Sequence, residues 1–290
     1  MLEVRFSGPA PGLDRFVRCY VQREVRIHGT PVVHPVPARA ATMLEFDFGD
    51  PVDVVSIDRR WRDKSPLFVV VGPRTSRNID LHLSGTLKAF VIMFRPDGLQ
   101  RLFGLPTAEI SDRSFDAPSV LGSYISQAGQ ILGEAPSFEA RVRFANEWLF
   151  RQSLRAGEVD AISEAANRMI LSGGRADLMA LADSVGLSSR QFARRFTRQI
   201  GMRPKLFARI ARFEAALEHK AFFALKSWTE IAHEFGYYDQ MHMVHDFAEF
   251  TGETPGGILN HLEAVFVEPI KRMRLSATTG NAIDRPRLIL

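Results

Sequence analysis

The sequence predicts an α+β protein with a β-rich N-terminal domain, a helical connector and an all-α C-terminal domain. Short apolar segments separated by Pro and Gly extend to about residue 105. Helical periodicity begins near residue 119, and a helix–glycine turn–helix pattern then occurs twice. We therefore expect a β-rich domain at 1–118, a connector at 119–158, a helical domain at 159–262 and a poorly ordered tail at 263–290 that contains the basic run Lys271–Arg274.

Size and composition restrict the class of protein. A chain of 290 residues favours two domains over one, and 46% apolar residues is ordinary for a globular protein. The formal net charge is only +4, so the distribution of charge is more informative than its sum. Cys19 is the single cysteine, which excludes a disulfide framework or a thiolate metal cluster and fits a cytoplasmic location. Neither a signal peptide nor an apolar stretch of membrane-spanning length is recognisable, so no membrane association is expected.

Strand patterns fill the N-terminal part of the chain. The segments 44–48 and 79–83 alternate apolar and polar residues, as half-buried strands do, whereas 67–71 and 89–94 are continuously apolar. Several short strands at regular spacing predict a barrel or a sandwich. A short helix is expected over 97–105, after Pro96. Six aromatic residues on these segments are either plain core, which is commoner at strand spacing, or the lining of a ligand cavity: Phe46, Phe48, Trp61, Phe68, Phe90 and Phe94.

The connector carries one apolar helical stripe. Phe138, Val142, Ala145 and Leu149 recur at the spacing of one helix face. This stripe either packs within the chain or forms a dimer surface, and a homodimer is expected. A second helix follows over 159–171 and ends at Gly173-Gly174.

The first copy of the repeated pattern runs from Leu178 to Pro204. Gly186 supplies the turn and Ser188 is a good N-cap for the second helix. Phe192 and Phe196 lie four residues apart and are expected to face inward. The other side and its flanks then present guanidinium and amide groups, which can read guanine and adenine edges in the major groove: Arg190, Gln191, Arg194, Arg195 and Arg198.

The second copy has one more residue in its turn. With that allowance Met243 matches Phe192, Phe247 matches Phe196, and Asp239 takes the N-cap position. Gln240, Met241, Val244 and His245 are then expected to project outward. A helix that starts at Pro204 and extends to about residue 220 should hold the two units at a fixed separation, suited to successive major grooves on one face of DNA.

Charge distinguishes the two copies. Between Ser184 and Phe213 there are eight basic residues and no acidic one, which is the electrostatic pattern of a phosphate-binding surface. From Lys226 to His261 there is one basic residue against six acidic ones. We therefore expect the first copy to supply most of the affinity for DNA, while the second copy presents an acidic outer face.

The duplicated region resembles the AraC/XylS family of bacterial transcription regulators. The resemblance rests on Leu-Ala…Gly-Leu-Ser-x-Arg-x-Phe-x-Arg-x-Phe…Gly-x-x-Pro in the first copy and Ile-Ala…Gly-Tyr-x-Asp-Gln-x-His-x-x-x-x-Phe…Thr-Gly-x-Thr-Pro in the second, over about residues 159–260. It implies a seven-helix domain that contacts bases through Arg190 and Arg194, and through Gln240, Met241 and His245. Met241, Met243 and His245 depart from the residues usual in the family. Gly72-Pro73-Arg74-Thr75 and the run from Phe94 to Pro106 resemble one branch's sensor half, which implies a cupin-like barrel for a small effector or dimer contacts.

The sequence therefore predicts a transcription regulator that binds double-stranded DNA, is modulated by a small molecule, and has RNA polymerase as a candidate partner. No nucleophile elbow or phosphate-binding loop is present, so we expect no enzyme and no cofactor. His28 with His34, and His242 with His245, lack a complete ligand set, so no metal site is expected. Two alternatives stay open. One is an enzyme whose site lies in the β domain, and the other is an interaction module whose repeated units no longer bind DNA.

Overall fold

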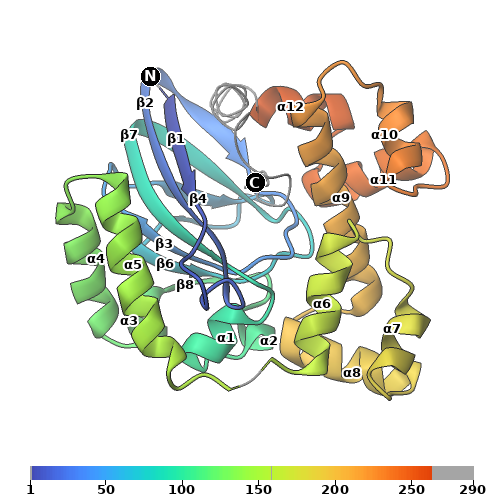
Figure 1. The fold of residues 1–290 in the computed structure, drawn as a ribbon. Helices are drawn as coiled ribbons and strands as arrows, with labels where there is room; N and C mark the ends of the chain where they lie inside the picture. The colour runs from blue at the N-terminus through green and yellow to red at the C-terminus, as the bar shows by residue number, and fades with distance from the viewer. Residues whose placement is uncertain (1, 158, 263–290) are drawn as a thin grey trace.

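A computed structural model describes residues 2–157 and 159–262, which form two packed bodies (Figure 1). The N-terminal body is an antiparallel sheet with helices packed against it, and the C-terminal body contains helices alone. This arrangement confirms the predicted α+β class. The predicted tail at 263–290 lies outside the described residues. Within the described ranges, no helix has both the length and the apolar character needed to cross a membrane.

All N-terminal strands belong to one sheet with antiparallel pairing. Its order is β1-β2-β7-β3-β6-β8, and β4 pairs with both β7 and β5. The two longest strands pair from Val17 opposite Phe94 to Pro35 opposite Asp80. The strands are β1 (Leu2–Ser7), β2 (Val17–Pro35), β3 (Met43–Asp47), β4 (Asp53–Ser56), β5 (Arg62–Lys64), β6 (Phe68–Val71), β7 (Ile79–Phe94) and β8 (Ser114–Asp116).

Strand β7 corrects one prediction. The sequence pattern separates 79–83 from 89–94 at Ser84-Gly85, but both segments belong to a single strand. Gly85 adopts a φ of 70° inside this strand and pairs with Ile27, where the β2 ladder changes register. The glycine therefore bends the strand instead of ending it, as glycine does in strand interiors.

Five helices pack against the sheet. The predicted helix after Pro96 is confirmed as α1, and the predicted stripe lies on α5, where Phe138, Ala145 and Leu149 are buried. This stripe packs within the chain. The apolar side chains exposed on α4, α5 and the residue after α5 are different ones: Tyr124, Ile131, Phe150 and Leu154. The helices are α1 (Gly98–Phe103), α2 (Thr107–Ile110), α3 (Ala117–Leu121), α4 (Tyr124–Glu134) and α5 (Phe138–Ser153).

Most of the N-terminal aromatic residues form the core between the sheet and these helices. The Phe46 ring lies 6.4 Å from that of Trp148, and the Phe90 ring lies 6.3 Å from that of Phe138. Phe46, Phe90 and Phe94 are fully buried, which favours the core interpretation of these rings. Trp61 differs, because it lies in the turn between β4 and β5 and is 49% exposed.

One long helix organises the C-terminal body. Helix α9 begins at Pro204, in the first helical position, and buries the predicted stripe of Phe207, Ile210, Phe213 and Leu217. Figure 1 shows the other helices arranged around it. They are α6 (Ala161–Leu171), α7 (Leu178–Ser184), α8 (Ser189–Ile200), α9 (Pro204–Phe222), α10 (Trp228–Glu234), α11 (Gln240–Thr251) and α12 (Pro255–Leu262).

Candidate nucleic-acid interface

The first repeated unit consists of α7, a glycine turn and α8. Gly186 has a φ of 66°, the left-handed conformation that a turn between crossing helices requires. Ser188 and Gln191 form a capping box, in which Ser188 Oγ accepts from the Gln191 N–H (3.3 Å) and Gln191 Oε1 accepts from the Ser188 N–H (3.1 Å). Phe192 and Phe196 are buried as predicted. These local interactions determine which face of α8 points outward.

The outward face of α8 presents four exposed guanidinium groups. Arg190, Arg194, Arg195 and Arg198 are all exposed. Within the part of the chain that the structure describes, none of them has an acidic partner, so all four are available for a ligand. Gln191 is less available, because its carbonyl oxygen is held in the capping box and only its amide donors remain.

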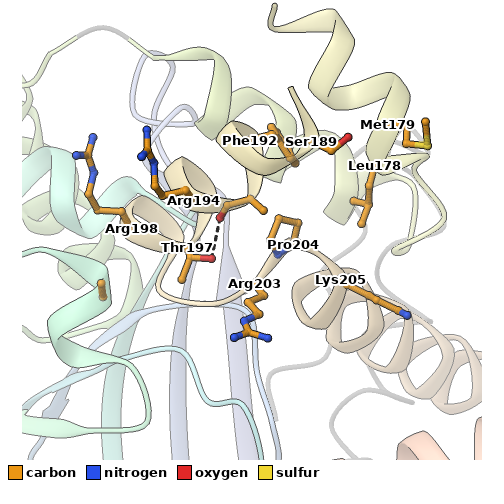
Figure 2. Close-up of a pocket in the computed structure, with 12 residues that line it drawn as sticks. Leu178, Met179, Ser189, Phe192, Arg194, Thr197, Arg198, Arg203, Pro204 and Lys205 are labelled. Atoms are coloured by element: carbon orange, nitrogen blue, oxygen red, sulfur yellow. Dashed lines mark hydrogen bonds between the residues drawn. The ribbon is translucent and has the colours of Figure 1, made fainter. Parts of the chain in front are cut away.

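A cavity of about 660 Å³ lies beside this face, bounded by α7, α8 and the start of α9. Figure 2 shows Arg194 and Arg198 on α8, with Arg203 and Lys205 on either side of Pro204. Arg203 and Lys205 are exposed and extend the basic surface beyond α8. Sequence reasoning counted them only as charge, although the Gly-x-x-Pro ending of the unit places them next to the end of α8.

The second unit repeats the scaffold through α10, Gly236 and α11. Gly236 has a φ of 69°, and Asp239 Oδ1 caps α11 by accepting from the His242 N–H at 2.7 Å. Met243 and Phe247 are buried, which confirms the alignment with one additional turn residue. The predicted outward residues Gln240, Met241 and His245 are exposed, while Val244 is half-buried. Sequence reasoning missed Tyr238, which is 89% exposed in the turn.

The predicted acidic outer face of the second unit needs a correction at Asp246, and most of its other carboxylates have local partners. Asp246 is completely buried, and both Asp246 and Glu249 pair with Arg209 of α9. Glu230 belongs to the Ser227 capping box, Glu234 pairs with Lys226, and Asp239 is the N-cap of α11. Glu230, Glu234, Asp239 and Glu249 nevertheless stay exposed, so the burial of Asp246 and these local pairings weaken the predicted acidic outer face without removing it.

Arg209 links the two units electrostatically. Its Nη2 lies 2.6 Å from Asp246 Oδ1 and 2.6 Å from Glu249 Oε2. The hydrogen bond from Arg209 holds the pKa of Glu249 below its usual range, and the same pairing raises the pKa of Arg209. The sequence counts Arg209 among the eight unopposed basic residues between Ser184 and Phe213. In the structure its guanidinium pairs with Asp246 and Glu249, so Arg209 is not part of the candidate DNA surface.

Among the described residues, the histidines group differently from the pairs that the sequence suggests. His242 does not join His245 in a ligand cluster; His245 instead lies with Asp246 and Glu249, and its Nδ1 is 3.8 Å from Glu249 Oε2. Arg209 already donates to both carboxylates, so its guanidinium supplies the positive charge in this cluster.

Two helix-turn-helix units on one shared helix, following an antiparallel sheet domain, are the architecture that the resemblance to AraC-type regulators implies. The helix-turn-helix domain family matches residues 181–261, and a domain of unknown function, DUF6597, matches residues 6–116. These two matches cover separate parts of the chain, and the first supports its resemblance to AraC-type regulators.

The fold is also similar to that of ToxT from Vibrio cholerae. For the O395 structure the TM-score is 0.50 at 9% identity, covering 85% of this chain and 99% of ToxT. For a second crystal form the TM-score is 0.51 at 9% identity, covering 83% and 98% of the two chains. No curated protein matches the chain. At this identity the likeness shows the fold alone.

We expect Asp246→Asn to destabilise the chain by roughly 1–3 kcal/mol, because the buried side chain loses its charge-assisted hydrogen bonds to Arg209, which then pairs with Glu249 alone. Urea denaturation measures the change, and Asp183→Asn on the exposed side of α7 is the matched control. Because the folded pKa of Glu249 is depressed, its contribution is present above its unfolded pKa of about 4.3 and is lost as the pH falls through the lower folded value. Equal stability of both variants would exclude this structural role.

Proposed function

We propose that the chain binds double-stranded DNA in a sequence-dependent manner and regulates transcription, acting as a binding protein and not as an enzyme. One observation carries the proposal. Six exposed cations surround the outward face of the first unit, and none of them has an acidic partner in the described structure: Arg190, Arg194, Arg195, Arg198, Arg203 and Lys205. Guanidinium forks can pair with the O6 and N7 atoms of guanine, and the remaining cations can neutralise phosphates.

The two units contribute unequally in this proposal. Helix α11 contains neither Lys nor Arg, so the second unit gains little from phosphate attraction. Its exposed Gln240 and Met241 can still contact an adenine edge and a thymine methyl group. The Gln240 side-chain oxygen accepts from Thr229 Oγ1 at 2.7 Å, which orients the amide. The second unit therefore adds specificity to an affinity that the first unit supplies.

The N-terminal body supports regulation by a small molecule. A second cavity, of about 560 Å³, lies by the β4–β5 turn and is lined by Trp61, Arg59, Arg60, Arg62 and His82, among others. Arg59 adopts a φ of 54°, a backbone conformation that is uncommon outside glycine. Arg60 and Arg62 pair with Asp58 and Asp53, whereas Arg59 has no acidic partner among the described residues. A guanidinium beside a half-exposed indole suits an anionic ligand with a flat apolar part. We place the effector in this cavity.

Assembly partners follow from the same function. A homodimer is supported by the apolar side chains exposed around α4 and α5, namely Tyr124, Ile131, Phe150 and Leu154. RNA polymerase is the partner that transcription regulation implies.

Binding to mixed-sequence duplex DNA should weaken steeply with salt. Neutralising about five phosphates gives a slope of about −4.5 in log Kobs against log salt concentration. A fluorescence-anisotropy titration at several salt concentrations measures this slope. No binding even at low salt would overturn the proposal and favour an interaction module.

Arg194→Ala should reduce affinity by about 1–3 kcal/mol and relax the preference at the base pair that it reads. His245→Ala should cost less, because His245 stands on the unit without other cations. Selection of bound sequences from random DNA, followed by Kd measurements on the selected duplex, tests both changes. A larger loss for His245→Ala would reverse the proposed ranking of the two units.

The anionic aromatic dye anilinonaphthalene sulfonate serves as a probe of the effector cavity. We expect Arg59→Ala to weaken dye binding about fivefold to tenfold, because it removes a charge-assisted contact. Arg26→Ala, at an exposed position on β2, is the matched control and should leave the affinity unchanged. Equal affinities for all three proteins would move the effector site elsewhere.

A further inference from the structure

The N-terminal body contacts the C-terminal end of the first recognition helix. Ser111, directly after α2, places its Oγ 2.9 Å from the carbonyl oxygen of Gly201, the residue that ends α8. Gly201 has a φ of 87°, and a Cβ at this position would lie 2.2 Å from Ser111 Oγ. The close approach therefore depends on the glycine of the first Gly-x-x-Pro ending.

A different segment of the N-terminal body makes the equivalent contact with the second recognition helix. Arg77 Nη1 donates to the carbonyl oxygen of Thr251 at 3.0 Å, and Gly252 follows with a φ of 75°. Asp80 orients this guanidinium through two hydrogen bonds of 2.9 and 3.0 Å. Nearby, the Ala38 N–H donates to the Phe250 carbonyl oxygen at 2.9 Å. The last carbonyls of a helix have no partner within it and carry partial negative charge. Hydrogen-bond donors are therefore favoured at the C-terminal ends of both α8 and α11.

The two contacting segments are joined to each other. Thr75 donates from its N–H and its Oγ1 to the Asp112 carboxylate, both at 2.7 Å, and the Asp112 N–H donates to the Pro73 carbonyl at 2.8 Å. Arg74 adds a hydrogen bond to Ser114 at 2.9 Å. We call residues 72–80 and 107–113 together the bracket. One end of the bracket holds α8 and the other end holds α11.

We propose that the bracket sets the relative position of the two recognition helices, with Arg77 and Ser111 as positioning residues. The inference rests on the proposed function, because it concerns how the two units meet successive grooves. Helix α9 joins the two units, and the bracket contacts the C-terminal ends of α8 and α11. The N-terminal body therefore helps to set the preferred distance between the two half-sites. The effector cavity is coupled to the bracket, because Asp80 lines that cavity and also orients Arg77.

The test uses the full chain and duplexes that carry the selected half-sites at different separations around one helical turn, about 10 base pairs. Wild-type protein should prefer one separation. Arg77→Ala and Ser111→Ala should reduce the Kd ratio between the best separation and one two base pairs longer by about fivefold or more, a typical coupling between sites. Binding to the half-site of the first unit alone should stay unchanged, which a general loss of structure would not allow.

Two further variants separate positioning from stability. Thr75→Val weakens the link between the two segments by removing the Oγ1 hydrogen bond to Asp112, without touching either recognition helix, and should also flatten the dependence on separation in part. Arg77→Lys should recover part of it, because it keeps the charge but loses the paired hydrogen bonds to Asp80. Arg26→Ala is the control. Unchanged profiles in Arg77→Ala, Ser111→Ala and Thr75→Val would overturn the inference alone, whereas a wild-type protein that binds no duplex would overturn the proposed function with it.

Discussion

Helix α9 forms part of the core of both helix-turn-helix units, and packing against α9 positions the other C-terminal helices. Near its start the Phe207 ring lies 5.3 Å from Phe196 of the first unit, and further along the Phe213 ring lies 4.8 Å from Phe247 of the second. Between these two contacts Arg209 pairs with Asp246 and Glu249. Apolar packing and this ion pair therefore hold the second unit against α9, the same helix that packs against the first unit. The shared core therefore limits how far either helix can turn, and the bracket contacts act within that limit.

The shared scaffold explains how the two units can differ so much in surface chemistry. The caps, glycine turns and inward aromatic residues maintain the fold in both units, which leaves the outward positions free to differ. The first unit places arginines there. The second unit engages its exposed carboxylates in capping and ion pairing, and Gln240, Met241 and His245 occupy outward positions on α11. An excess of acidic residues in the sequence is therefore compatible with neutral side chains at positions 240 and 241 of α11.

The features that the sequence predicted are local ones. Gly186, Ser188 and Asp239 act within a few residues of their partners, so their roles follow from spacing alone. The inward positions of Phe192 and Phe247 follow from helical periodicity in the same way. The Arg209–Asp246 pair joins residues 37 positions apart, and the Ser111–Gly201 contact joins residues 90 positions apart. No periodic pattern encodes such pairs, because they depend on how the helices are placed in three dimensions. For the same reason the sequence could not show that Arg209 is neutralised or that Gly85 lies inside a continuous strand.

The N-terminal body thus has more than one connection to the proposed DNA surface. It braces the ends of α8 and α11, and its Asp80 belongs both to the Arg77 contact and to the cavity beside Trp61. The central claim is nevertheless the unequal contribution of the two units to DNA binding. Hydroxyl-radical footprinting of the full chain on its selected duplex tests this claim most directly. We expect strong backbone protection at the groove whose protection is lost in Arg194→Ala, and weaker protection about one helical turn away. Equal protection of both grooves, or stronger protection at the second, would contradict it.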